Sequence, residues 1–138
     1  TVISPSIKHW VPEILASKDE DLSYFPYMNG TFVFKHAVVR FSEVIMEGLV
    51  ANGLSVKDID LLIPHQANLR ISQFVQQKFQ LRDDQIYNNI MQYGNTTAAS
   101  IIIALTEAWE KGMVKENDLV ILAAFGSGFT WGSVIIRW

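Results

Sequence analysis

Apolar residues recur at the three- and four-residue spacing of an α-helix in three separate parts of the chain. The first part runs from Thr31 to a stop at Gly53, the second covers about 68–79, and the third covers 96–111. In each part the apolar positions gather on one side, so we expect amphipathic helices that pack against a common core.

Between these helices the pattern changes to short apolar runs bounded by turn residues, which is typical of strands. We expect five strands, in chain order 1–10, 60–64, 85–88, 119–124 and 131–138, with a long loop at 11–30. The resulting order, β-α-β-α-β-α-β-β, predicts an α/β fold with a five-stranded mixed sheet and helices on both faces. The last two strands form an antiparallel hairpin.

Composition narrows the class of protein. With 138 residues and 49% hydrophobic content, residues 1–138 are most simply one domain. The net charge of −3 without charged blocks argues against binding to nucleic acid or to a membrane surface. No apolar run reaches the roughly 20 residues of a transmembrane helix, and the start has no basic segment, so we expect a cytoplasmic protein. The first residue is not Met, which suggests a piece of a longer chain.

The chain contains no Cys, which excludes disulfides, thiolate metal sites and a cysteine nucleophile within these residues. The spacing of His and carboxylate residues does not indicate a metal site either. Any nucleophilic chemistry through a thiolate would need residues from outside this chain.

Two polar residues stand where open α/β sheets place their functional sites. His65 directly follows the expected strand 60–64, and Asn95 opens the expected helix 96–111 after the permissive Gly94. Both are hydrogen-bond donors that could face one reacting carbonyl. The plainer alternatives are an ordinary hydrogen-bonded His and a helix-capping Asn, a cap being worth about 1 kcal/mol. The small residues 98–100 favour tight packing or a close approach to developing negative charge.

A glycine-rich segment, Gly126–Gly132, joins the last two expected strands. Because no helix follows it, we reject a dinucleotide-binding loop. Its exposed backbone amides could serve as oxyanion donors, although a simple turn is the default.

Three segments, Ile63–Arg70, Tyr93–Ser100 and Ala124–Gly132, together resemble 3-oxoacyl-(acyl-carrier-protein) synthase III, and Met28–Lys35 resembles the entry into the long helix of that family. The resemblance covers nearly the whole chain. It implies the carboxyl-terminal half of a thiolase-like fold, whose other half has the nucleophilic cysteine. It also implies an acyltransferase that condenses an acyl-CoA primer with malonyl-acyl carrier protein by decarboxylation, without a cofactor.

The same resemblance implies a role for particular residues. His65 and Asn95 would hold the malonyl thioester carbonyl, and Phe125, Gly126, Ser127 and Gly128 would form the oxyanion loop and the cysteine pocket. Ser127 stands where the family usually has Gly or Ala. The remaining assignments are a supporting role for Asn68 and carrier-protein binding for Arg70.

The implied partners are acyl carrier protein, acyl-CoA and the amino-terminal half, with a homodimer for the complete enzyme. Two alternatives stay open. One is a related enzyme of secondary metabolism, and the other is a thiolase-fold interaction domain without catalysis. The pairing of His65 with Asn95 argues against the second, because a structural domain does not need both.

Overall fold

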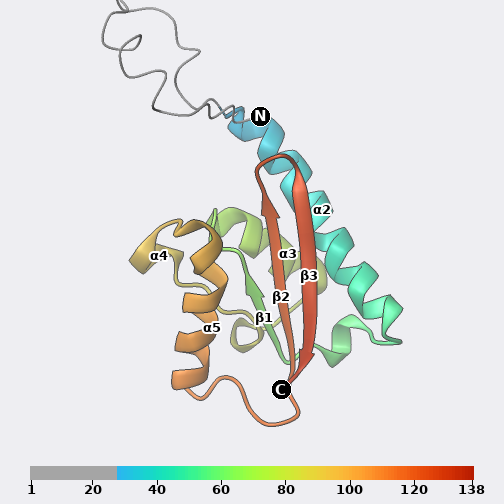
Figure 1. The fold of residues 1–138 in the computed structure, drawn as a ribbon. Coiled ribbons are helices and arrows are strands. Elements are labelled where there is room, and N and C mark those ends of the chain that lie inside the picture. The colour runs from blue at the N-terminus through green and yellow to red at the C-terminus, as the bar shows by residue number, and fades with distance from the viewer. Residues whose placement is uncertain (1–27) are drawn as a thin grey trace, which may run out of the picture.

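The computed structural model of the protein describes residues 28–138. The strand expected at 1–10 and nearly all of the loop expected at 11–30 therefore lie outside the described residues. Within them a three-stranded mixed sheet runs through the centre of the domain (Figure 1). Its strands are β1 (Leu61–Pro64), β2 (Leu119–Gly126) and β3 (Thr130–Arg137).

The central strand is β2, parallel to β1 on one side and antiparallel to β3 on the other. The register places Leu61 opposite Val120 and Phe125 opposite Trp131. All four residues of β1 are buried, as expected for a strand that is covered on both faces. The antiparallel hairpin predicted at the end of the chain is confirmed.

Helices cover both faces of the sheet, as the sequence predicts. On one face, α2 (Gly30–Ala51) and α3 (Leu69–Phe79) pack on the residues of β1 and β2 that point toward them, among them Leu62 and Ile121. On the other face, α5 (Ser100–Glu110) packs its Ala104 and Ala108 against the alternate residues of those strands. Figure 1 shows α2 and α5 on opposite sides of the sheet. Helices on both faces of a sheet are typical of an α/β domain.

The segment 85–88 departs from its predicted strand. It follows the short 3-10 helix η3 (Asp83–Gln85) and pairs with β1 only through a parallel bridge between Ile86 and Leu62. The physical reason is that the side chain of Gln66, and not a neighbouring strand, accepts the hydrogen bonds of the backbone that follows. The next backbone N–H groups, of Asn89 and Ile90, donate to the buried Oε1 of Gln66 at 3.0 and 3.1 Å and not to a carbonyl of β1.

The helix predicted at 96–111 is shorter than expected. A four-residue helix, α4 (Ile90–Tyr93), and a 3-10 turn, η4 (Thr97–Ala99), precede α5, which begins only at Ser100. Thr97 has a φ of +53°, a conformation that interrupts a right-handed helix and is strained for a β-branched residue. The Oδ1 of Asn95 accepts the N–H of Thr97, the first residue of η4, so Asn95 lies ahead of the 3-10 turn and not at the start of the α-helix.

The remaining turns satisfy their own polar groups. The 3-10 helix η2 (Val56–Asp58) leads into β1, and Asp58 accepts hydrogen bonds from both the backbone and the hydroxyl of Ser55.

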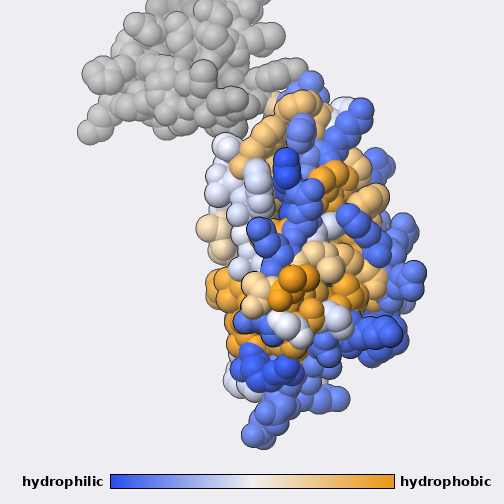
Figure 2. Space-filling model, turned by 90° about the vertical axis from the view of Figure 1, so that its right-hand side faces the viewer, coloured by the Kyte–Doolittle hydropathy of each residue, from blue (hydrophilic) through white to orange (hydrophobic). Residues whose placement is uncertain are grey.

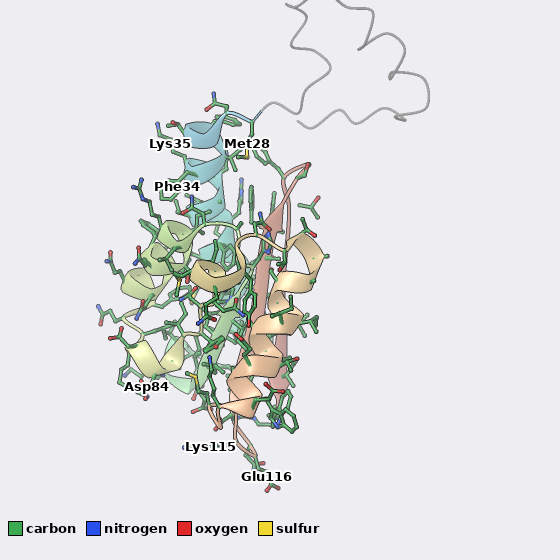
Figure 3. The ribbon with its side chains drawn as sticks, turned by 90° about the vertical axis from the view of Figure 1, so that its left-hand side faces the viewer. Met28, Phe34, Lys35, Asp84, Lys115 and Glu116 are labelled. Carbon is green, nitrogen blue, oxygen red and sulfur yellow. The ribbon has the colours of Figure 1, made fainter. Side chains whose placement is uncertain are left out.

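Seen with α5 in front, the start of α2, labelled by Met28 and Lys35, lies at one end of the domain, and the loop with Lys115 and Glu116 lies at the other (Figure 3). No helix within residues 28–138 is both long and apolar enough to cross a membrane.

Candidate active site

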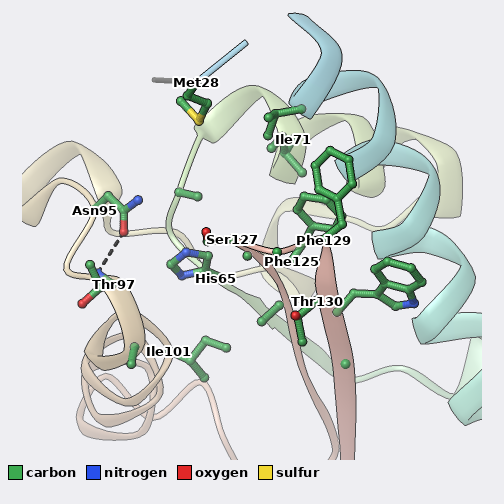
Figure 4. A pocket seen from close by; sticks show the side chains of 18 of the residues that line it. Met28, His65, Ile71, Asn95, Thr97, Ile101, Phe125, Ser127, Phe129 and Thr130 are labelled. Carbon is green, nitrogen blue, oxygen red and sulfur yellow. Dashed lines mark hydrogen bonds between the residues drawn. The ribbon is translucent and has the colours of Figure 1, made fainter. Parts of the chain in front are cut away.

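A cavity of about 890 Å³ opens where β1 and β2 end, at the carboxyl edge of the sheet. The polar side chains of His65 and Asn95 reach it from two separate loops, and the β2-β3 hairpin supplies its third side (Figure 4). Apolar side chains form much of the remaining wall, and these are Met28, Phe32, Val33, Ile71 and Ile101. A largely apolar cavity with a few converging polar groups is the usual form of a small-molecule site.

His65 is held through both its backbone and its side chain. Its backbone N–H donates to the carbonyl of Ala123 at 2.7 Å, which extends the pairing of β1 with β2 by one residue. Its Nδ1 lies 2.6 Å from the hydroxyl of Ser100, the first residue of α5. The ring is half-buried, and this burial lowers the pKa of His65 below its ordinary value of 6.5. His65 is therefore a neutral imidazole at pH 7.

Asn95 presents its amide group to the same cavity. Its Oδ1 accepts the backbone N–H of Thr97 at 2.9 Å, drawn as a dashed line in Figure 4. This bond fixes the side chain, and Nδ2, which has no hydrogen bond among residues 28–138, can donate into the cavity. Gly94, with a φ of +67° and a ψ of −158°, turns the chain into this position, a conformation essentially reserved for glycine.

Gln66 ties the two polar loops together. It follows His65, is only 2% exposed, and donates from Nε2 to the carbonyl of Pro64 at 2.7 Å. Its Oε1 accepts the N–H groups of Asn89 and Ile90, at the start of the segment that leads to Asn95. The loop of His65 and the loop of Asn95 are thus joined through one buried amide, which limits their relative motion.

The hairpin turn, residues 127–129, closes the third side with backbone and aromatic groups. Gly128 and Phe129 both have a positive φ, of +78° and +52°. Beneath the turn Phe125 is only 7% exposed and stacks nearly parallel to Trp131, with ring centroids 6.2 Å apart. Arg40 of α2 lies over the Trp131 ring at 5.1 Å. These contacts hold the strand residues on either side of the exposed turn in place.

The structure places six of the eight predicted site residues around this cavity: His65, Asn95, Phe125, Gly126, Ser127 and Gly128. Asn68 and Arg70 do not line it. The Oδ1 of Asn68 accepts the backbone N–H of Arg70 at 2.9 Å and so caps α3, while the Arg70 side chain is exposed. Among residues 28–138 no three His, Asp or Glu side chains are grouped to hold a metal ion.

Comparison with known proteins decides the family. The family described as "3-Oxoacyl-[acyl-carrier-protein (ACP)] synthase III C terminal" matches residues 49–138, which include both polar loops and the hairpin. The chain belongs to this synthase III family. A Beta-ketoacyl-[acyl-carrier-protein] synthase III of Clostridium tetani is 47% identical over 139 residues, covering 100% of this chain and 40% of the relative. A synthase III of Caldanaerobacter subterraneus is 46% identical over 81% of this chain and 34% of its own length.

Solved structures of the synthase III family share the fold. The 3-oxoacyl-[acyl-carrier-protein] synthase III of Aquifex aeolicus superposes with a TM-score of 0.81 and 42% identity, over 86% of this chain and 38% of that one. This likeness confirms the thiolase-like fold predicted from the sequence motifs. The chain spans between a third and two fifths of the length of these synthase III relatives.

Sequence reasoning did not identify two polar groups that organise this synthase III site. Ser100 is only 1% exposed and contacts His65, but in the sequence it is one of several small residues at 98–100. Gln66 lies between two predicted site residues without a periodic signal of its own. The adjacency of Gln66 to His65 was the available clue, since a polar residue directly after a buried strand must find hydrogen-bond partners.

Proposed function

We propose that this chain is the carboxyl-terminal half of an enzyme that condenses an acyl-CoA primer with malonyl-acyl carrier protein at the start of fatty acid synthesis. The observation that carries the proposal is the placement of His65 and Asn95 on one cavity, where each residue has a side-chain nitrogen without a hydrogen bond among residues 28–138. The names of the relatives, Beta-ketoacyl-[acyl-carrier-protein] synthase III, support the same reaction class.

The proposed reaction needs an anion stabilised away from water. The bond between the malonyl carboxylate and the α-carbon breaks, carbon dioxide leaves, and the electron pair moves into an enolate whose charge rests on the thioester oxygen. His65 and Asn95 donate hydrogen bonds to that oxygen, each worth roughly 3 kcal/mol by comparison with other oxyanion holes. The enolate carbon then attacks the acyl thioester on a cysteine of the other half, forming the new carbon-carbon bond and releasing the thiolate.

Ser100 supports the donor role of His65. The backbone N–H of Gln66 already donates to the Ser100 hydroxyl oxygen at 3.2 Å, so the hydroxyl hydrogen is free to point to Nδ1 of His65. A neutral imidazole that accepts at Nδ1 carries its proton on Nε2, the atom available to the thioester oxygen. The lowered pKa of His65, caused by burial, favours this neutral form.

The hairpin supplies the second anion site of the proposal. The backbone N–H near Ser127 joins the amide of the cysteine from the other half as donors to the acyl-transfer oxyanion, and Phe125 lines the cysteine pocket. A three-residue turn on a buried aromatic base supports this role, because preorganised amides stabilise charge best. Ser127 keeps the amide that Gly or Ala would offer.

The remaining assignments concern partners. We propose that the exposed Arg70 belongs to the surface that receives the acidic acyl carrier protein, and that Asn68 orients this surface by capping α3. The amino-terminal half of the same enzyme covers the cavity and brings the cysteine, and the complete protein is a homodimer. Acyl-CoA and malonyl-acyl carrier protein are substrates, so no cofactor is required.

The test separates the two half-reactions in the complete enzyme that contains this chain. His65→Ala and Asn95→Ala should slow malonyl decarboxylation by about 100-fold or more, as loss of one oxyanion donor does, and leave acylation by acyl-CoA nearly unchanged. Gln92→Ala, an exposed amide on α4, is the matched control. Equal loss of both steps in the two variants would contradict the proposed role, and absence of decarboxylation in the unmodified enzyme would contradict the function.

A further inference from the structure

The carboxylate of Glu107 is the centre of a hydrogen-bond cluster outside the cavity. It accepts from three neutral groups: the Tyr93 hydroxyl on Oε1 at 2.6 Å, and the Asn89 Nδ2 and Tyr87 hydroxyl on Oε2 at 2.8 and 3.0 Å. Lys111, the C-cap residue of the same helix, donates to the Tyr87 hydroxyl, and its Nζ lies 4.9 Å from the Tyr87 ring centroid. One side chain of α5 thus gathers three side chains from a single preceding segment.

That segment is the one that leads to Asn95. Tyr87 and Asn89 are buried just before α4, and Tyr93 ends α4 two residues before Asn95. A helix of four residues cannot maintain itself, because isolated helices of that length are unstable in water. Beyond it the backbone is strained at Thr97, where φ is +53°. The position of Asn95 therefore depends on restraints supplied from elsewhere in the fold.

Charge makes the Glu107 cluster a strong restraint. The hydrogen bond from Tyr93, followed by that from Asn89, lowers the pKa of Glu107 below its ordinary value of 4.5, so the group is ionised at neutral pH. Hydrogen bonds to an ionised acceptor are shorter and stronger than those between neutral groups. The 2.6 Å contact with Tyr93 has this character, and the same bond raises the pKa of Tyr93.

We propose that Glu107 is a positioning residue for Asn95. Its carboxylate anchors Tyr93 and Asn89 to α5. The short stretch from Tyr93 to Thr97 then holds the Asn95 amide toward the cavity. Gln66 restrains the same segment through the backbone of Asn89 and Ile90, and Glu107 restrains it through side chains. The inference rests on the proposed function, since it assigns Glu107 to the donor used in decarboxylation.

The first test follows the loop itself and does not need activity. Amide hydrogen exchange of residues 93–97 should be faster in Glu107→Gln and in Tyr93→Phe than in the unmodified protein. Glu110→Gln removes the same charge from a neighbouring exposed position of α5, so it should leave this exchange unchanged. Equal exchange in E107Q, Y93F and the unmodified protein would overturn the positioning role, whatever reaction the enzyme catalyses.

The second test measures the consequence for catalysis in the complete enzyme. A displacement of a reacting group by about 1 Å costs about 100-fold in rate, so we expect E107Q and Y93F to lower kcat for malonyl decarboxylation by about 10- to 100-fold. KM for malonyl-acyl carrier protein and the rate of acylation should stay unchanged, which a general loss of folding would not produce. Glu110→Gln should match the unmodified enzyme.

The double variant completes the argument. If Tyr93 and Glu107 act through their mutual hydrogen bond, Y93F/E107Q should be no slower than the slower single variant, whereas independent effects would multiply. Multiplication of the two losses would overturn the proposed coupling. If the unmodified enzyme fails to decarboxylate malonyl-acyl carrier protein, the proposed function fails, and the exchange experiment still decides whether Glu107 holds the loop.

Discussion

The hydroxyl of Ser100 contacts Nδ1 of His65 at 2.6 Å across 35 positions of sequence. It joins the first residue of α5 to the residue that directly follows β1. Ser100 is buried, and its oxygen also accepts the N–H of Gln66, so one small side chain satisfies two groups of the His65 loop. The start of α5 and the carboxyl end of β1 are therefore fixed to each other at the cavity wall.

Replacement of Ser100 by Ala should impair both stability and decarboxylation. The change leaves the Gln66 N–H and Nδ1 of His65 without a partner, which costs roughly 1–3 kcal/mol of unfolding free energy. Because His65 loses the group that selects its tautomer, decarboxylation in the complete enzyme should fall by about 10-fold. Chemical denaturation and a malonyl decarboxylation assay measure the two effects.

Ser133→Ala is the control for that change. Ser133 also donates from a partly buried hydroxyl to a carbonyl, that of Val44 at 2.9 Å, and it does not itself line the cavity. It should lose stability by roughly 0.5–1.5 kcal/mol and keep its decarboxylation rate. An unchanged rate in Ser100→Ala would show that His65 does not need the contact.

Acid should destabilise the fold through His65. Burial lowers the pKa of His65 in the folded protein below 6.5, whereas the unfolded chain keeps the ordinary value. The unfolded state then binds a proton more readily, so the contribution of the neutral ring is present above pH 6.5 and is lost as the pH falls through the folded-state value. His65→Gln should lack this part of the pH dependence.

The measurement is a pair of denaturation series between pH 7.5 and pH 5, together with an NMR titration of the His65 ring. A ring that titrates at or above 6.5 would contradict the assignment of burial as the dominant effect. So would equal pH dependence of the variant and the unmodified protein.

The chain on its own should not form an acyl-enzyme. It has no Cys, and the acyl transfer that we propose proceeds through a thiolate. Incubation with radiolabelled acetyl-CoA should therefore give no stable label, while the complete enzyme treated in parallel should be labelled. Stoichiometric labelling of the isolated chain would mean that one of its own hydroxyl or amine groups is the nucleophile.

The isolated chain should also self-associate through apolar side chains. The α5 helix is apolar on more than one side, and the side that faces away from the sheet leaves Ile102 and Trp109 60% and 56% exposed. The opposite surface, over α2, also displays apolar groups among polar ones (Figure 2). Val39 and Val50 of α2 are both exposed. Surfaces of this kind normally mark contacts with other protein segments, which in our proposal belong to the other half of the enzyme.

Sedimentation velocity over a concentration series measures this association. Ile102→Glu should weaken it, and Thr106→Glu, which adds the same charge at an exposed polar position of α5, should weaken it less. A chain that stays monomeric at high concentration and binds no hydrophobic dye would contradict the expected contact between the halves.

The sequence predicted those parts of the fold that depend on local patterns. The apolar run of β2, the amphipathic α2 and the glycine-containing hairpin lie where periodicity and turn residues placed them. His65 and Asn95 were identified because the ends of strands and the starts of helices can be predicted from neighbouring residues, although the helix after Asn95 begins later than predicted. The motifs of the family then predicted that both face one site.

The departures arise where distant residues replace local structure. Residues 85–88 have a strand-like composition, but the amide of Gln66 takes the backbone N–H groups that follow. The α5 helix starts late because Thr97 adopts a positive φ that composition does not reveal. The contacts of Ser100 with His65 and of Glu107 with Tyr93 link positions that only the folded chain brings together.

The bonding mode of Gln66 has a consequence for building hybrid enzymes. Its Oε1 accepts hydrogen bonds from the main-chain N–H groups at positions 89 and 90, so these two bonds do not depend on which side chains those positions carry. A segment 88–97 transplanted from a distant relative should dock correctly as long as the recipient keeps Gln66 and Glu107 and the segment keeps Asn89 and Tyr93, whose side chains donate to Glu107. A transplant of the His65 loop that replaces Gln66 would instead disturb Asn95, a donor almost thirty positions away on a segment that was not exchanged.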